Sequence, residues 1–297
     1  MEYQLIGITR SNQFSPNHIG NDAAIFQQTV RELEKAGCRT IVMSEEEFLR
    51  ADFPMPYIFN MARNKITIER LFQLEKSGSL VVNSPVGIDN CTREKMTRLL
   101  LASQIPHPDS WIVPTDKPLS EELLNQIVFP CWIKRGDFHA IHREDVSFVR
   151  HREEADCILS EYALRNIPIA VINGHLKGDL IKFYGVADTD FFYWFYPFEH
   201  QHSKFGLETI NGASQGFPFS IDRLREICSQ AAHILHVSVY GGDCVVGSDG
   251  SMRLIDFNDW PSFAPCRKQA APYIAQTILE KISLHRIRVL NNALIIK

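Results

Sequence analysis

Three polar residues near the carboxyl-terminal end of the chain have the types and spacing of a metal site. Asp249-Gly250 lies between two alternating runs and predicts a hairpin with a two-residue type I′ turn, because that turn needs positive φ at both central positions. In such a hairpin Asp243 faces Asp256. Side chains alternate along a strand, so Asn258 shares their face. The neighbouring side chains are expected to point the other way: Cys244, Ile255 and Phe257.

Two opposed carboxylates repel each other unless a cation lies between them. Mg²⁺ prefers oxygen ligands and is held by one or two carboxylates together with substrate phosphates. The set Asp243, Asp256 and Asn258 therefore predicts a site for Mg²⁺ or Mn²⁺ rather than for zinc or copper. The alternative is a solvated acidic face, but Val245 and Leu254 on the same face favour a buried one.

Three lysines stand where surface lysines are less expected. Lys95 lies in the first turn of a predicted helix, Lys134 ends the apolar strand that starts at Phe129, and Lys182 lies inside another apolar run. Each one alone is better explained as a surface lysine whose stem rests on apolar residues than as a ligand. Together with the acidic hairpin, they predict clamps for the phosphates of a metal-bound nucleotide.

In this order, the motifs resemble those of the ATP-grasp superfamily. The resemblance covers roughly residues 80–265 and depends on the ordered combination, since each motif alone is weak. Val82-Asn83-Ser84 leading to Arg93-Glu94-Lys95 resembles the start of the family's central domain, residues 129–134 its phosphate-binding lysine strand, and residues 255–261 its magnesium strand. The superfamily includes D-alanine ligases, glutathione synthetases, glutamate ligases that modify a ribosomal protein, and a branch of inositol-phosphate kinases.

The resemblance implies an ATP site. Residues 170–179 resemble the hinge strand whose backbone contacts adenine, with Asp179 reaching the ribose hydroxyls. Asn173 stands where a Glu or Gln is common, and the loop 135–144 has one Gly where many members have several. The implied nucleotide-binding residues are Lys95, Lys134, Asn173, His175, Leu176, Asp179 and Lys182.

The resemblance also implies an acceptor site between the first lobe and the metal. Loops that follow the strands of an open α/β sheet commonly hold ligands, and Arg10 and Arg63 both follow predicted strand ends. We expect both, with Lys182, to act in catalysis by holding a carboxylate or phosphate, although each alone is also explained as a surface residue. Four loop histidines are interpreted as solvated rather than as metal ligands: His139, His142, His200 and His202.

The elements that must position these residues follow from hydrophobic periodicity. In the first ninety residues we expect a mostly parallel sheet made of strands 4–9, 39–43, 56–61 and 80–83. Helices are expected from Asn21 or Asp22 to Gly37 and over 66–77. The Gly-rich fingerprint of a dinucleotide site follows none of these strands. Further along, helices are expected over 92–104, 120–126, 152–165 and 221–236, and strands over 128–133, 145–149, 168–173 and 179–186. The aromatic run 191–198 favours a buried strand over a stacking wall, and 199–218 a loop.

The predicted fold class is α/β and α+β. It is an ATP-grasp architecture in which two α+β subdomains clasp the nucleotide after a pre-grasp lobe. The predicted boundaries are 1–90 for the lobe, 91–173 for the central subdomain and 174–297 for the carboxyl-terminal subdomain with the metal-binding hairpin.

Composition narrows the partners and the compartment. The formal charge of −4 gives no electrostatic footprint for nucleic acid or an acidic membrane. Seven scattered cysteines match neither a zinc site nor a disulfide framework, which favours the cytoplasm. No apolar run approaches the length that spans a bilayer. We expect a monomer or homodimer that binds small molecules.

The function that we expect is ATP-dependent ligation of a small-molecule carboxylate to an amine through an acyl phosphate. The alternative is a small-molecule kinase, in which a hydroxyl attacks the γ-phosphate instead. A nucleotide-binding regulator without turnover is a third possibility, against which the complete set Asp243, Asp256 and Asn258 argues.

Overall fold

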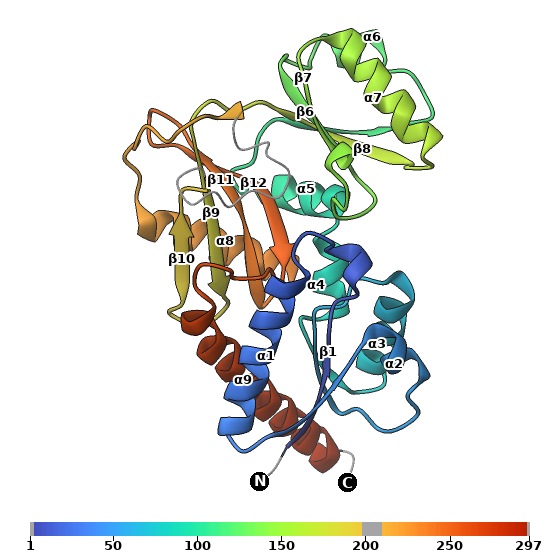
Figure 1. The fold of residues 1–297 in the computed structure, drawn as a ribbon, viewed down its shortest axis with the longest axis vertical. Helices are drawn as coiled ribbons and strands as arrows, with labels where there is room; N and C mark the ends of the chain where they lie inside the picture. Colours follow the sequence, from blue (N-terminus) through green and yellow to red (C-terminus); the bar gives the residue numbers. More distant parts are fainter. Residues whose placement is uncertain (1–2, 198–209, 296–297) are drawn as a thin grey trace.

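The first part of the chain forms an α/β lobe around a four-stranded parallel sheet (Figure 1). The computed structural model describes residues 3–197 and 210–295. Strand order is β2-β1-β3-β4, and helices connect the strands as parallel pairing requires. The strands are β1 (Gln4–Ile8), β2 (Arg39–Met43), β3 (Tyr57–Asn60) and β4 (Leu80–Val82), and the helices are α1 (Ile19–Lys35), α2 (Glu45–Arg50) and α3 (Lys65–Lys76).

The apolar stripe of α1 is the predicted one: Ile25, Phe26, Val30 and Leu33 are buried. The helix begins at Ile19, earlier than the expected start at Asn21 or Asp22. The residue before it, His18, makes no side-chain cap, so the preference of Asn and Asp for the cap position misplaced this boundary.

The second sheet is antiparallel, with order β5-β8-β6-β7 and a hydrophobic core of its own. Its strands are β5 (Ser110–Pro114), β6 (Cys131–Arg135), β7 (Val146–Val149) and β8 (Ile169–Gly174), covered by α6 (Glu121–Leu124) and α7 (Arg152–Leu164). Helices α4 (Pro85–Asn90) and α5 (Arg93–Ala102) lead into it. The predicted strand 128–133 is shifted to 131–135, because Pro130 has no N–H for the ladder.

The third sheet has order β10-β9-β11-β12 and is also antiparallel. It comprises β9 (Asp179–Val186), β10 (Phe192–Phe195), β11 (Val239–Val246) and β12 (Met252–Asp259), with α8 (Ile221–Leu235) packed on one face. The aromatic run forms the edge strand β10, and its Phe191 and Phe195 are buried. Phe198 and most of the predicted loop 199–218 lie outside the described residues.

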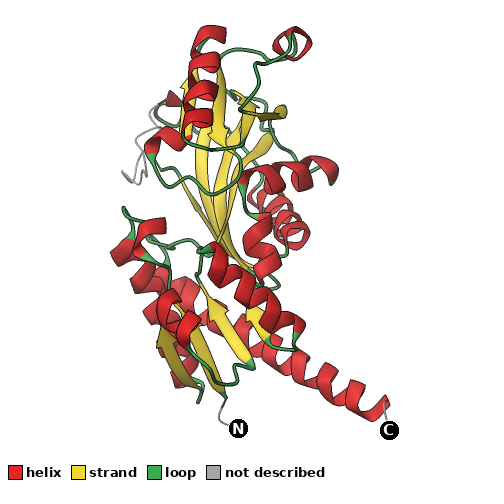
Figure 2. Cartoon of the chain, turned by 90° about the vertical axis from the view of Figure 1, so that its right-hand side faces the viewer, coloured by secondary structure: helices red, strands yellow, loops and turns green. Residues whose placement is uncertain are grey.

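The last helix, α9 (Arg267–Ile295), returns to the first lobe and lies beside α1 (Figure 1). One continuous core joins side chains of α1, β9 and α9. Buried Asn83, just after β4, reinforces this junction: its amide accepts from the backbone N–H of Val239 at 2.8 Å and donates to the carbonyl of Val239 at 2.8 Å. Figure 2 shows the end of α9 projecting beyond the first sheet.

The hairpin differs from the prediction in two ways that compensate each other. Its turn is not a two-residue type I′ turn, because Gly247 pairs with Ser251 and only Gly250, with φ of 77°, has the left-handed conformation. A β-bulge then shifts the register between Asp243 and Cys244, so that Ile255 is the extra residue on β12. Asp243 consequently still faces Asp256, as predicted.

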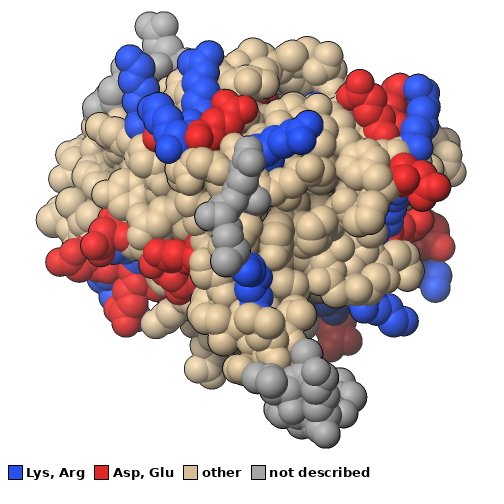
Figure 3. All heavy atoms as spheres, turned by 90° about the horizontal axis from the view of Figure 1, so that it is seen from below, with Lys and Arg blue, Asp and Glu red and all other residues tan. Residues whose placement is uncertain are grey.

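The surface gives no sign of a large single-charge field on the face seen in Figure 3, where basic and acidic side chains are interspersed. Within the described residues, no helix has the length and apolar character needed to cross a lipid bilayer. The predicted domain boundaries at 90/91 and 173/174 stay predictions.

Candidate active site

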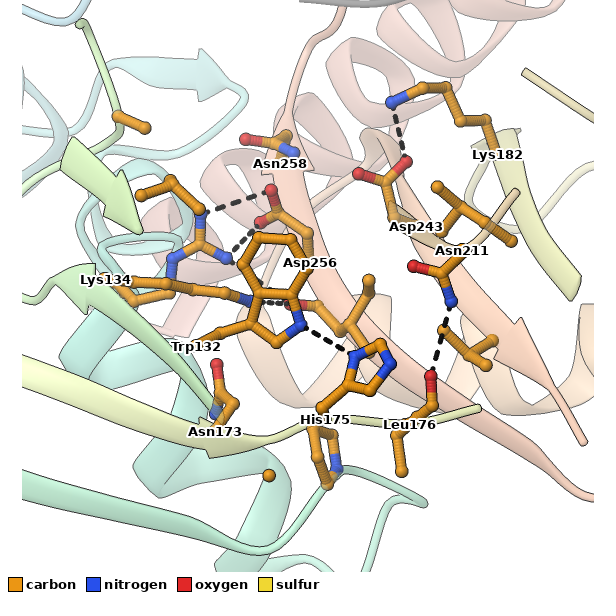
Figure 4. Close-up of a pocket in the computed structure, with 18 of the residues that line it drawn as sticks. Trp132, Lys134, Asn173, His175, Leu176, Lys182, Asn211, Asp243, Asp256 and Asn258 are labelled. Carbon is orange, nitrogen blue, oxygen red and sulfur yellow. Dashed lines mark hydrogen bonds and ion pairs between the residues drawn. The ribbon is translucent and has the colours of Figure 1, made fainter. Parts of the chain in front are cut away.

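A cavity lies between the second and third sheets and reaches the first lobe (Figure 4). Both sheets contribute one face to it, and Arg63 and Arg93 close it from the side of the first lobe and α5. From the second sheet and the segment after it come Trp132, Lys134, Val146, Asn173, Gly174, His175 and Leu176. From the third sheet come Leu180, Lys182, Asp243, Val245, Ile255, Asp256 and Asn258.

The three predicted metal ligands lie together in this cavity, on the paired strands β11 and β12. Asp243 pairs with Lys182 at 2.9 Å, and Asp256 pairs with the Arg93 guanidinium at 2.9 Å. Burial alone would raise the pKa of Asp256, but Arg93, Lys134 and a hydrogen bond from Asn258 lower it to about 2. Two carboxylates and an amide, all with oxygen donors, fit a hard divalent cation.

Among residues 3–197 and 210–295, no three His, Cys, Asp or Glu side chains form a cluster that could hold a metal. The hairpin offers a different donor set, made of two carboxylates and an amide. Such a set suits Mg²⁺ or Mn²⁺, which share ligands with substrate phosphates, and not a structural zinc site.

Lys134 is buried in the cavity, and its ammonium donates to the carbonyl of Ile255 at 3.1 Å. Ile255 was expected to point away from the site, but as the extra residue of the bulge it lines the cavity. Burial, together with the nearby Arg93 charge, lowers the pKa of Lys134 to about 7. The bulge thus supplies a main-chain acceptor for a lysine that would otherwise be buried without one.

Lys95 is not part of this site, contrary to the prediction. Its side chain is 49% exposed and pairs with Asp89. Two residues correspond to about 200° around a helix, so Lys95 and Arg93 lie on opposite sides of α5. Arg93 shares the buried face with Met96 and Leu100, a spacing that could have identified it from the sequence.

Asp179 is also placed elsewhere. Its buried carboxylate accepts from the backbone N–H groups of Gln215 at 2.7 Å and Phe217 at 2.8 Å, and it does not line the cavity. The side chain therefore anchors the segment after residue 210, which in turn brings Asn211 to the cavity, where its amide donates to the Leu176 carbonyl at 3.3 Å.

The polar groups at the hinge end of the cavity have a fixed orientation. Ser110 donates its hydroxyl hydrogen to the carbonyl of Pro108 at 2.6 Å, so it can only accept from the Asn173 amide nitrogen at 2.7 Å. This leaves the Asn173 Oδ1 atom buried and without a hydrogen-bond partner in the described part of the chain. In Figure 4 the Trp132 indole N–H donates to His175 Nδ1, which is therefore unprotonated, at a distance of 3.2 Å.

The two predicted acceptor arginines have different surroundings. All three nitrogens of Arg10 donate to the protein: Nε to the Met61 carbonyl at 3.1 Å, Nη1 to Asp22 at 3.0 Å and Nη2 to the Trp260 carbonyl at 3.0 Å. Arg10 therefore ties the first lobe to the end of β12. It also lines a second cavity, described below, and its role in holding a carboxylate or phosphate stays a prediction. Arg63 instead lines the cavity, where it pairs with Asp259 at 2.8 Å.

A second cavity adjoins the first at two of the predicted metal ligands, Asp243 and Asn258. The two share Arg63, Lys182, Asp243 and Asn258, and the rest of the second cavity comes from α1, β9, β11 and the loops after β1 and β12. It lies where the resemblance implied an acceptor site. Tyr184, Gly241 and Pro261 form part of its wall.

The loop histidines divide into two groups. His142 is exposed, as expected, but His139 is buried, lines the first cavity and lies 3.5 Å from Asp259. The solvated interpretation was therefore wrong for His139, because the loop after β6 folds inward against the first lobe. His200 and His202 lie outside the described residues.

The similarity of this chain to known proteins was found in its structure and not in its sequence. No protein-family model and no curated protein matches the chain. Among solved structures, the ATP-grasp ligase PsnB complexed with a minimal precursor is 14% identical, with coverage of 95% of this chain and 100% of that one and a TM-score of 0.61. The chain has the ATP-grasp fold. The architecture predicted from the motifs is thus confirmed.

Two D-alanine–D-alanine ligases share this ATP-grasp fold along almost their whole length. The Coxiella burnetii enzyme is 13% identical with a TM-score of 0.69, and each chain is covered over 100%. The Bacillus anthracis enzyme, solved in complex with ATP, is 12% identical with a TM-score of 0.67, covering 97% of this chain and 99% of that one.

Proposed function

We propose that the protein is an ATP- and Mg²⁺-dependent ligase that joins a small-molecule carboxylate to an amine through an acyl phosphate. The observation that carries the proposal is the pair of adjoining cavities, with Asp243 and Asn258 at their boundary. The basic side chains Arg63, Arg93, Lys134 and Lys182 line the first cavity, which suits a triphosphate. The similarity to PsnB and the D-alanine–D-alanine ligases supports this class of reaction.

Each part of the nucleotide has a candidate partner in the first cavity. The apolar half, which includes Val146, Leu180 and Val245, suits a base, and the charged half suits the phosphates. A divalent metal held by Asp243, Asp256 and Asn258 would neutralise phosphate charge. Arg93, Lys134 and Lys182 already lie beside these carboxylates and would contact the phosphate oxygens.

The proposed reaction has two steps. An oxygen of the substrate carboxylate attacks the γ-phosphorus, the bond to the ADP oxygen breaks, and an acyl phosphate forms. The nitrogen of the amine then attacks the acyl carbon, loses a proton and displaces inorganic phosphate. Phosphoryl transfer needs positioning and charge stabilisation, which Lys182 and Arg63 can give because both face the two cavities.

A carboxylate labelled with ¹⁸O tests this chemistry. We first screen acids and amines for ADP release and then incubate the active acid with and without hydroxylamine. Acyl activation transfers one labelled oxygen to phosphate and gives a hydroxamate, both detectable by mass spectrometry. A kinase would esterify phosphate to the acceptor, retain every label on carbon and form no hydroxamate, and this result would reject the ligase.

Asn173 is expected to select the base of the nucleotide. Its buried Oδ1 can accept from the 6-amino group of ATP but not from the 6-oxo group of ITP, and an unmatched buried acceptor costs about 1–3 kcal/mol. We expect ATP to bind about tenfold tighter than ITP, and Asn173→Leu to remove the difference. Calorimetric titration of both nucleotides measures this; equal affinities in the unmodified protein would contradict it. Ser110→Ala, which frees the amide to rotate, should weaken the discrimination while Asn173 is retained.

A further inference from the structure

Asp259, the last residue of β12, lies where three parts of the chain meet. Its side chain is 1% exposed. The Arg63 guanidinium, from the loop after β3, donates to its Oδ1 at 2.8 Å and to its main-chain carbonyl at 3.3 Å. His139, from the loop after β6, lies 3.5 Å from the same Oδ1, and Arg10 lies 3.9 Å from Oδ2. One carboxylate therefore connects the first lobe, the loop after β6 and strand β12.

The backbone that carries Arg63 is itself fixed by a second buried carboxylate. Glu45, at the start of α2, accepts from the backbone N–H groups of Ser11 at 2.9 Å and Asn64 at 2.8 Å. It thereby joins the loops after β1 and β3 through their main chains. With the loops held in this way, the direction of the Arg63 guanidinium depends on what its own nitrogens contact.

The partner that sets this direction is Asp259. Within the described residues, Arg63 Nε is buried without a hydrogen-bond partner, and the guanidinium donates through Nη2 to Asp259. Arg63 lines both cavities. A buried ion pair seldom adds net stability compared with apolar residues of similar size. The Arg63–Asp259 ion pair lies at the boundary of two cavities, and we therefore interpret it as orienting Arg63 rather than as stabilising the fold.

The loop that carries His139 also docks on the first lobe through aromatic contacts. Phe138 packs against Phe14, with ring centroids 5.7 Å apart, and Lys65 lies 5.9 Å from the Phe138 ring. Asp259 gives the adjacent His139 a polar contact at the end of β12. The position of this loop and the orientation of Arg63 thus depend on the same carboxylate.

We propose that Asp259 is a positioning residue that couples the docking of the 136–142 loop to the orientation of Arg63 between the nucleotide and acceptor cavities. Docking of this loop on the first lobe and orientation of Arg63 toward the acceptor cavity then occur together. This inference rests on the proposed function for the identity of the two cavities, but the contacts that define the coupling do not depend on it.

The test uses Asp259→Asn, which keeps the shape of the side chain and removes its charge. We expect the Kd for ATP to stay within about twofold, the KM for the acid to rise by about 10- to 100-fold, and amide hydrogen exchange in residues 136–142 to speed up with and without ATP. Asp190→Asn, the same change at an exposed carboxylate that pairs with Arg225, serves as the control and should alter none of these. A lowered melting temperature with unchanged loop exchange and acid KM would overturn the proposal.

Two further variants keep the proposal testable if Asp259→Asn does not fold. His139→Gln should speed up exchange in the loop, and Arg63→Lys, which keeps the charge but loses the planar fork, should raise the acid KM. If Asp259 couples the two, His139→Gln should also raise the acid KM, and Arg63→Lys should also speed up exchange in the loop. Two independent effects would contradict the coupling. Failure of the proposed function appears differently, as no acid-dependent ADP release by the unmodified protein, while the exchange measurements still report on the docking.

Discussion

Asp256→Asn is expected to lower Mg²⁺-dependent ATP turnover by at least about 100-fold while leaving a folded protein. Asp256 faces Asp243 across the hairpin, and the change removes the charge that would bind the metal. It also leaves Arg93 without its carboxylate partner at 2.9 Å, so that arginine is free to misplace the phosphates. ADP release at saturating ATP and Mg²⁺ measures the effect, and circular dichroism checks the fold.

The matched control for this prediction is Asp249→Asn, the same substitution at an exposed turn residue of the same hairpin. It should keep turnover within about twofold. Asn258→Ala, which removes the neighbouring oxygen donor, should behave like Asp256→Asn. Normal turnover in either Asp256→Asn or Asn258→Ala would show that the hairpin does not hold the metal.

Lys134→Met is expected to weaken ATP binding by about 10- to 100-fold, since a charge-assisted contact with phosphate contributes about 1.5–3 kcal/mol. The pH dependence is a sharper test, because burial lowers the pKa of Lys134 to about 7 in the free protein. Phosphates favour the ammonium form, so above pH 7 ATP binding should take up a proton and affinity should fall as pH rises. Calorimetry in two buffers of different ionisation enthalpy measures this uptake, which Lys134→Met should abolish.

The same lowered pKa predicts that the stability of the free protein rises with pH, whereas its affinity for ATP falls. Between pH 7 and the ordinary lysine pKa of 10.5, the unfolded chain binds a proton at Lys134 that the folded protein has lost, so this group makes folding more favourable as pH rises through that window. Below pH 7 the folded protein keeps a buried charge at full cost. Lys134→Met should therefore raise the melting temperature at pH 6 more than at pH 9. A lowered melting temperature at pH 6 would contradict the assignment.

Much of the fold could be predicted because its elements have strong local signals. Strand β2 and strand β9 have the predicted bounds, and the apolar stripe of α1 is the predicted one. Boundaries were less accurate where a single residue decided them, as at Pro130 before β6. The pairing of Asp243 with Asp256 was right although the turn type was wrong, because the hairpin turn and the bulge at Ile255 shift the register in opposite directions.

The site was harder to predict where contacts join distant parts of the chain. Sequence alone could place Arg10 after a strand, but not show that Asp22 and two main-chain carbonyls occupy its nitrogens. Asp179 was assigned by resemblance, whereas its contacts come from a segment more than thirty residues later. Arg93 had a usable signal in its spacing from Met96 and Leu100, and motif matching to Lys95 obscured it.

The return of α9 to α1 affects how the protein can fold as it leaves the ribosome. The apolar face of α1 is completed by Ala271, Ile274 and Ile278, which are synthesised more than two hundred residues later. The core of the second sheet, in contrast, is drawn from residues 111–172 alone. Domains generally fold from the amino terminus onward during synthesis. Here the middle of the chain can become compact while the apolar face of α1 is still exposed, because α9 has not yet been synthesised. We expect a chaperone to bind the nascent chain at this exposed apolar face of α1.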